Sequence, residues 1–147
     1  MRPLLVVLLL LLLPAANAIV INEIMYAPIN TTLYTEWLEI YNNDSQNVDL
    51  TGWKIDGKSI SGIIAADDYR IIAKNNLKFL EHFNVSCDVI KVAIVLTNSG
   101  KNIQLNDSED KIIDAVFYNS SWGANGNNLN LTLSNYIFFY LFYYIFH

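Results

Sequence analysis

The sequence predicts an all-β sandwich with one short helix, and three observations support this fold class. Apolar and polar residues alternate over short runs, as in residues 36–42, where Leu38 and Ile40 share one face. Strong turn signals such as Asp56-Gly57 separate these runs. Only residues 75–83 show helical spacing instead. Short strands divided by polar turns are typical of a β-sandwich or barrel.

Residues 1–18 have the pattern of a secretory signal peptide. Arg2 supplies the positive start, residues 4–13 are apolar, and Ala16-Asn17-Ala18 places small residues at the cleavage positions. The alternative is an uncleaved membrane anchor, but a spanning helix needs about 20 apolar residues, and this run is shorter. We therefore expect a secreted protein, or one on the extracellular surface.

Composition limits the partners and the chemistry. The 147 residues include 9 basic and 14 acidic ones, with a net charge of −5, and an acidic surface repels phosphate backbones. We therefore expect no nucleic-acid partner. Cys87 is the single cysteine, which excludes an intrachain disulfide and a cysteine-based metal site. A small buried side chain is favoured for Cys87 over pairing with another molecule.

The sequence also contains more N-glycosylation patterns than chance provides. A chain of this composition would give about two matches to Asn-x-Ser/Thr at random. The candidate glycosylation sites are Asn30, Asn43, Asn84, Asn106, Asn119 and Asn130. Their number agrees with an exported glycoprotein.

The strands are expected in a regular order along the chain. The first covers residues 19–26 and ends before Pro28, because proline cannot donate to a strand ladder. The outward face of the second strand carries Trp37, Glu39 and Tyr41. Rings beside a carboxylate can contact a sugar or peptide, but they also arise as cross-strand pairs that cover a sheet. These three are candidate surface-contact residues, with the structural interpretation favoured.

Further strands are expected in residues 50–55, 58–60, 69–73, 89–96 and 112–118, with another around residues 103–105. The inward-facing apolar residues should form the core: Leu38, Ile40, Trp53, Ile55, Ile71, Ile103 and Leu105. The helix at residues 75–83 should use Asn75 or Asn76 as its cap and place Leu77, Leu80 and Phe83 on one side.

Several segments in order resemble the lamin tail domain, an immunoglobulin-like β-sandwich of nuclear lamins and of secreted or surface prokaryotic proteins. The segments are IVINEIMYAP, EWLEIYNND, VDLTGWKI, GIIAADDYRIIAKN, LTNSGKNIQLND and KIIDAVFY, followed by Trp122 and a Gly/Asn-rich loop. The resemblance covers residues 19–133. It implies an immunoglobulin-like domain at residues 19–134, with Trp53 packed between the sheets, and an accessory role in contacts with protein, carbohydrate or the cell envelope.

Residues 135–147 form an aromatic, apolar tail outside the family pattern. Three explanations stay open: a truncated or frame-shifted reading frame, a segment lying at a membrane interface, or an element added to the sandwich. The second would make the product a membrane-tethered surface module. We expect membrane contact only if this tail is part of the natural protein.

The sequence shows no recognisable catalytic, cofactor or metal-binding set. His82 and His147 are the only histidines, so no reliable Ser/His/Asp set can be assigned. Asp107, Glu109 and Asp110 could offer oxygen ligands to calcium, but they lack the spacing of a known calcium loop, and a solvated hairpin is favoured.

We therefore predict a non-catalytic exported binding module without a cofactor, whose partner is an unknown protein or glycan at the cell surface. The alternative is a small hydrolase that uses two carboxylates, for instance Glu23 and Glu39. Such chemistry needs the two carboxyl groups about 5–9.5 Å apart in a cleft.

Overall fold

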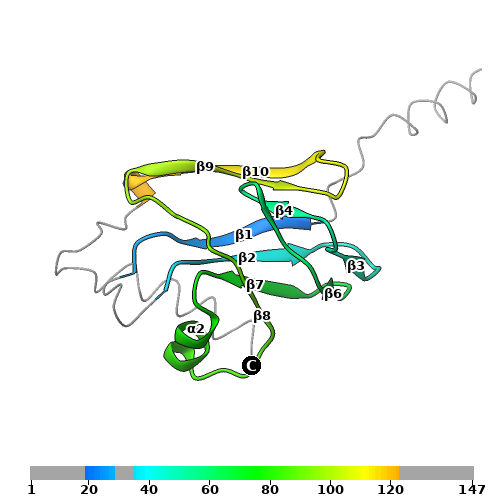
Figure 1. Ribbon diagram of the computed structural model, residues 1–147, viewed down its shortest axis with the longest axis horizontal. Coiled ribbons are helices and arrows are strands. Elements are labelled where there is room, and N and C mark those ends of the chain that lie inside the picture. Colours follow the sequence, from blue (N-terminus) through cyan, green and yellow to red (C-terminus); the bar gives the residue numbers. More distant parts are fainter. Residues whose placement is uncertain (1–18, 29–34, 123–147) are drawn as a thin grey trace, which may run out of the picture.

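The computed structural model describes residues 19–28 and 35–122, which form two facing four-stranded sheets, one short strand pair and one α-helix (Figure 1). The β-sandwich predicted from the sequence is confirmed. The predicted signal peptide, the aromatic tail and the candidate glycosylation sites Asn30 and Asn130 lie outside the described residues. Within the described ranges, no helix is long and apolar enough to cross a membrane.

The first sheet has the order β1-β2-β7-β8. Its strands are β1 (Ile19–Met25), β2 (Trp37–Asn42), β7 (Tyr69–Ala73) and β8 (Val89–Lys91). The first three pair antiparallel, whereas β7 and β8 pair parallel. A parallel pair needs a crossover connection, and the helix α2 (Asn76–Phe83) supplies it.

The second sheet has the order β10-β9-β4-β5, and its pairs are antiparallel. Its strands are β4 (Lys54–Ile55), β5 (Lys58–Ser59), β9 (Gly100–Asn106) and β10 (Ile112–Asn119). Asp56 and Gly57 connect β4 to β5 with φ angles of 51° and 73°, as a two-residue hairpin turn requires. The remaining elements are the pair β3 (Val48–Asp49) and β6 (Ile63–Ile64) and a 3-10 turn η1 (Ser120–Trp122).

The two sheets also meet along one edge, where β10 lies beside β1. The backbone N–H of Ile21 donates a 2.7 Å hydrogen bond to the Asp114 carboxylate. In the core below, the rings of Tyr26 and Tyr118 pack with their centroids 4.6 Å apart. The Tyr26 hydroxyl also donates a 3.3 Å hydrogen bond to Asn119 O, so two side chains, Asp114 and Tyr26, provide polar links between the sheets at this edge.

The core between the sheets contains five of the seven predicted core residues: Leu38, Ile40, Ile55, Ile103 and Leu105. Trp53, which the sequence placed in the core, packs against this core but is only partly buried. The physical reason is its position, because it follows the turn at Gly52 (φ 82°) and precedes the two-residue strand β4. Ile71 lies in a separate cluster on the opposite face of the first sheet.

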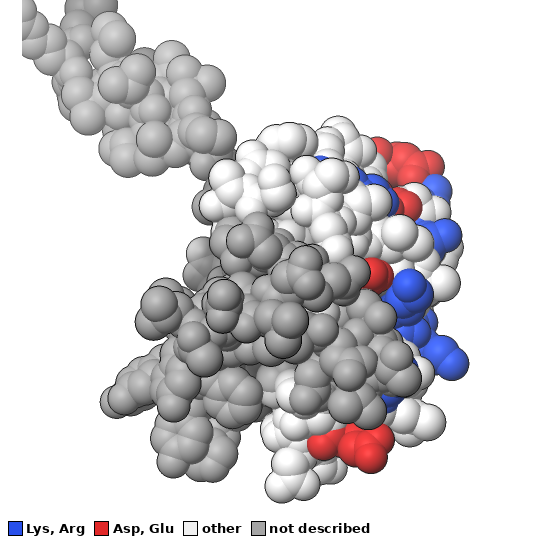
Figure 2. Space-filling model, turned by 90° about the vertical axis from the view of Figure 1, so that its left-hand side faces the viewer, with Lys and Arg blue, Asp and Glu red and all other residues white. Residues whose placement is uncertain are grey.

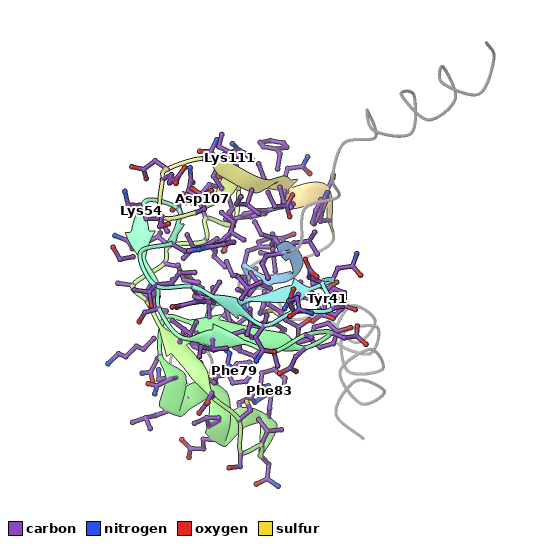
Figure 3. All side chains as sticks on the ribbon, turned by 90° about the vertical axis from the view of Figure 1, so that its right-hand side faces the viewer. Tyr41, Lys54, Phe79, Phe83, Asp107 and Lys111 are labelled. Atoms are coloured by element: carbon purple, nitrogen blue, oxygen red, sulfur yellow. The ribbon has the colours of Figure 1, made fainter. Side chains whose placement is uncertain are left out.

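That second cluster forms where α2 covers the outer face of the first sheet. Asn75 caps the helix, because its side-chain oxygen accepts a 3.2 Å hydrogen bond from Lys78 N. Phe79 is fully buried against Trp37, with ring centroids 5.4 Å apart in an edge-on arrangement (Figure 3). Leu77, which the sequence placed on the buried side, is 71% exposed.

Candidate binding face and a buried acidic pair

The three predicted contact residues do not form an exposed surface. Trp37 is buried under α2, and Glu39 is fully buried. Tyr41 is half-buried, its ring stacks on Tyr69 with centroids 4.6 Å apart, and its O–H donates to the Asp67 carboxylate. The structure therefore agrees with the favoured interpretation, in which these side chains cover the sheet, and not with the alternative of an exposed contact face, because this outer face of the sheet is a second packing surface.

Glu39 instead lies opposite Glu23 in the pairing of β1 with β2. The side-chain amide of Asn22 donates a 2.7 Å hydrogen bond to Glu39 Oε1. Burial, followed by the charge of Glu39, raises the pKa of Glu23 from 4.5 to about 7. Burial also raises the pKa of Glu39, while the Asn22 hydrogen bond opposes this rise.

The pair meets one requirement of a two-carboxylate hydrolase but fails another. Directly opposed residues have Cβ atoms about 4.5–5.5 Å apart, so the two carboxyl groups are close enough for such chemistry. However, Glu39 is 0% exposed and Glu23 only 8%. A substrate must touch both carboxyl groups, and this burial leaves it no access.

A free surface lies on the outer face of β9 and β10. The strand register places Phe117 opposite Asn102, Ala115 opposite Gln104 and Ile112 opposite Asn106. Phe117 is 63% exposed and Ile112 51%. We call this surface the amide face; it consists of Asn102, Gln104, Asn106, Ile112, Ala115 and Phe117.

Sequence reasoning missed the amide face because residues 112–118 are apolar at both alternating positions. A register shift between Ile112 and Asp114 decides which side chains point outward. After the shift, Val116 and Tyr118 face inward and Phe117 faces solvent. The amides at alternate positions of β9, Asn102 and Gln104, were the sequence signal that could have shown the polar outer face.

The comparison with known families matches the Lamin Tail Domain over residues 13–120, which is most of the chain. The chain belongs to the lamin tail domain family. The resemblance inferred from the sequence motifs is therefore confirmed, and the sandwich described above is the immunoglobulin-like fold of this family. No curated protein matches the chain. Family membership supports an immunoglobulin-like module with a non-catalytic role.

The acidic turn of this lamin tail domain has a structural explanation. Asp107 Oδ1 accepts backbone hydrogen bonds from Glu109 N at 2.9 Å and Lys111 N at 3.0 Å. Asp110 pairs with Lys54 at 2.6 Å, and Figure 3 shows Lys54, Asp107 and Lys111 at the same end of the molecule. These contacts close the β9–β10 hairpin. Among residues 19–28 and 35–122, no three Asp, Glu, His or Cys side chains gather as metal ligands would.

The lamin tail domain carries its charges in small groups of both signs. Figure 2 shows acidic and basic side chains interspersed on the described part of one face. Several of the charges of the described residues are paired with an opposite charge, as in Lys54–Asp110, Lys74–Glu36 and Lys101–Asp56. On this face the charge distribution favours no single strongly charged ligand.

The candidate glycosylation sites within the described residues differ in their surroundings. Asn43 and Asn84 are exposed, and Asn84 ends α2 in a left-handed conformation with a φ of 52°. The half-buried Asn106 donates its side-chain amide to Asp110 O at 3.0 Å. The half-buried Asn119 accepts a hydrogen bond from Ser121 N at 2.8 Å.

Proposed function

We propose that this lamin tail domain is a non-catalytic module of an exported protein that binds glycans at the cell surface through the amide face. The observation that carries the proposal is the Phe117 ring, 63% exposed and directly opposite the Asn102 amide on β9. An exposed ring bordered by amides offers both the apolar and the polar contacts that a sugar ring needs.

The chemistry of the face favours sugars over charged ligands. Each amide side chain supplies both hydrogen-bond donors and an acceptor, which suits the hydroxyl groups of a saccharide. Asn102 and Gln104 point outward along β9, followed by Asn106, whose amide nitrogen already donates to Asp110 O, while Ile112 and Phe117 add apolar surface from β10. Because these amides are neutral, binding should depend only weakly on salt.

Export rests on the predicted secretory signal at residues 1–18, and the candidate glycosylation sites support it. A protein partner in the cell envelope is the nearest alternative to a glycan, because exposed aromatic side chains also serve as anchors in protein interfaces. The two possibilities share the same face and differ in the class of molecule bound.

A glycan array probed with the purified domain tests the proposal. We expect binding to a neutral saccharide, with Phe117→Ala weakening it at least about tenfold, equivalent to ~1.4 kcal/mol. Ile63→Ala is the matched control, because Ile63 is also an exposed apolar side chain but lies on β6. The glycan assignment fails if no saccharide binds, or if Phe117→Ala and Ile63→Ala bind equally well. If the wild-type domain binds an envelope protein and Phe117→Ala does not, the amide face binds protein instead.

A further inference from the structure

A β-bulge brings two glutamates together on the outer face of the first sheet. Ile21 pairs with Ile40, and the register then shifts so that Glu23 pairs with Glu39. Without this register shift, Asn22 would lie opposite Glu39. The bulge therefore places one carboxyl group directly across from another, although like charges at opposed positions destabilise a strand pair.

Both carboxyl groups have an oxygen without a hydrogen-bond partner. Glu39 is fully buried and Glu23 is 92% buried. The Oε2 atoms of Glu23 and Glu39 are buried and accept no hydrogen bond, while Asn22 satisfies only Oε1 of Glu39. Buried polar atoms are nearly always hydrogen-bonded, so these two oxygens call for a bound species that joins them.

Within the described part of the chain, no ion pair supplies a counter-charge to the two glutamates. Tyr41 is engaged with Asp67, which is itself acidic. The ionisable side chains on the elements around the pair are Tyr41 of β2, Tyr69 and Arg70 of β7, Lys91 of β8, Asp114 of β10, and Lys78, Glu81 and His82 of α2. Arg70 lies opposite the core residue Ile40 rather than Glu39, and it pairs with Asp88. Asp114 accepts the hydrogen bond from Ile21 N. Lys91 lies on the edge strand, two strands from β2.

We propose that Glu23 and Glu39 bind one proton between them in mildly acidic solution, and that its loss toward neutral pH weakens the contact between β1 and β2. The shared proton lets one carboxyl group donate to the other and removes one of two buried negative charges. A divalent cation would be the other way to join the oxygens, but only two carboxylates are present and such ions need more ligands.

The direction of the pH effect follows from the pKa of Glu23, which rises from 4.5 to about 7 on folding. Between these values the folded protein keeps a proton that the unfolded chain has released, so the contribution of Glu23 to stability is fully present below pH 4.5 and is lost as pH rises toward about 7. Above this window both states have lost the proton, and the contribution of Glu23 no longer changes with pH. For Glu23 alone, the folding equilibrium constant should fall by up to about 300-fold across the window.

Urea unfolding of the full chain between about pH 5 and about pH 8 measures this effect. We expect the wild type to lose stability across this range. Glu23→Gln should remove most of the slope, because its neutral amide can donate to Glu39 as the protonated acid does. Glu81→Gln is the control, because Glu81 is an exposed residue of α2, and this variant should keep the wild-type slope.

Either of two results in the urea experiment would overturn the proposal, and so would one result with added metal. The urea results are a wild-type stability that stays level or rises across the window, and a Glu23→Gln variant with the wild-type slope. The metal result is stabilisation of the wild type, but not of Glu23→Gln, by added calcium at constant pH, which would assign the site to a metal. If Glu23→Gln does not fold, NMR titration of the Glu23 and Glu39 carboxyl carbons in the wild type decides, and the absence of an upward pKa shift at both residues would overturn the proposal.

Discussion

The side-chain amide of Asn42 donates a 2.8 Å hydrogen bond to the carbonyl oxygen of Ala65, and so joins the end of β2 to the segment after β6. The same amide donates to Gln46 O at 2.8 Å, and the Asn42 side-chain oxygen accepts from Asp44 N at 3.1 Å. Asn42 is fully buried. One side chain therefore satisfies backbone groups of two connections that no strand ladder reaches.

Asn42→Ala should lower the free energy of unfolding by about 2–4 kcal/mol, because it leaves several buried backbone groups without a partner. Chemical denaturation measures the change. Asn43→Ala is the matched control, since Asn43 is the exposed neighbour, and its effect should stay within about 0.5 kcal/mol. Similar losses in both variants would contradict a special role for the Asn42 amide.

Phe79→Ala should cost about 3–5 kcal/mol, because a fully buried ring that packs edge-on against Trp37 would be replaced by a cavity. Leu77→Ala should change stability by less than about 0.5 kcal/mol, since Leu77 is exposed on the same helix. Thermal unfolding of the two variants tests which side of α2 faces the sheet. A larger loss from Leu77→Ala would show that the helix is rotated from the orientation described above.

Gly100→Ala should destabilise the domain by about 3 kcal/mol or more. Gly100 has a φ of 113°, and an added Cβ would lie 2.6 Å from the carbonyl oxygen of Tyr118, within the β9–β10 pairing. Gly57→Ala is the control, because Gly57 has a φ of 73° but nothing lies within 4 Å of its added Cβ, so about 1–2 kcal/mol of backbone strain is expected. Equal losses would mean that β9 and β10 can separate without cost at this end.

Tyr41 should keep its proton to unusually high pH. Its hydrogen bond to Asp67 raises the pKa of Tyr41 from 10.0 to about 12, because the neutral phenol is the donor. Asp67→Asn should bring this pKa back toward 10.0, and asparagine tolerates the φ of 54° at this turn. Ultraviolet titration of phenolate absorbance measures the shift.

The alkaline stability of the same variant gives a second measurement. Between pH 10.0 and about 12 the unfolded chain has lost the Tyr41 proton that the folded chain keeps, so wild-type stability falls as pH rises through this range. Asp67→Asn should show a smaller fall. Asp68→Asn is the control, because Asp68 accepts a hydrogen bond from Tyr69 N, whereas the Tyr41 hydroxyl donates to Asp67. An unchanged titration in Asp67→Asn would show that the hydrogen bond does not hold the phenol proton.

The positions of many strands, and the residues that face the core, could be predicted from the sequence, because period-two alternation fixes which residues of a strand share a face. Leu38 and Ile40 on β2, and Ile103 and Leu105 on β9, lie inward for this reason. Alternation does not say what covers the other face. The sequence of β2 gives no indication that α2 covers Trp37, or that Glu23 lies across from Glu39. Both side chains were therefore placed on an outward face.

The remaining differences arise in short elements, where the sequence pattern does not determine which side chains face the core. Eight residues of α2 contain apolar side chains on several sides, so the spacing alone does not distinguish Leu77 from Phe79 as the buried one. The predicted strand at residues 89–96 pairs only as far as Lys91, although the alternation continues to Leu96. The amide face depends on a register shift after Ile112, and a single extra residue of this kind has no distinct sequence signal.

The hydrogen bond from Ile21 to Asp114 has a consequence for how the protein is made. These residues are 93 positions apart, so β1 has to wait for nearly the whole described chain to be synthesised before its edge is covered. Contacts so distant in sequence slow folding, and strand edges exposed in the meantime attract other chains. A nascent chain stalled before β10 should therefore depend on chaperones to stay soluble, and release of β10 should be the step that ends this dependence.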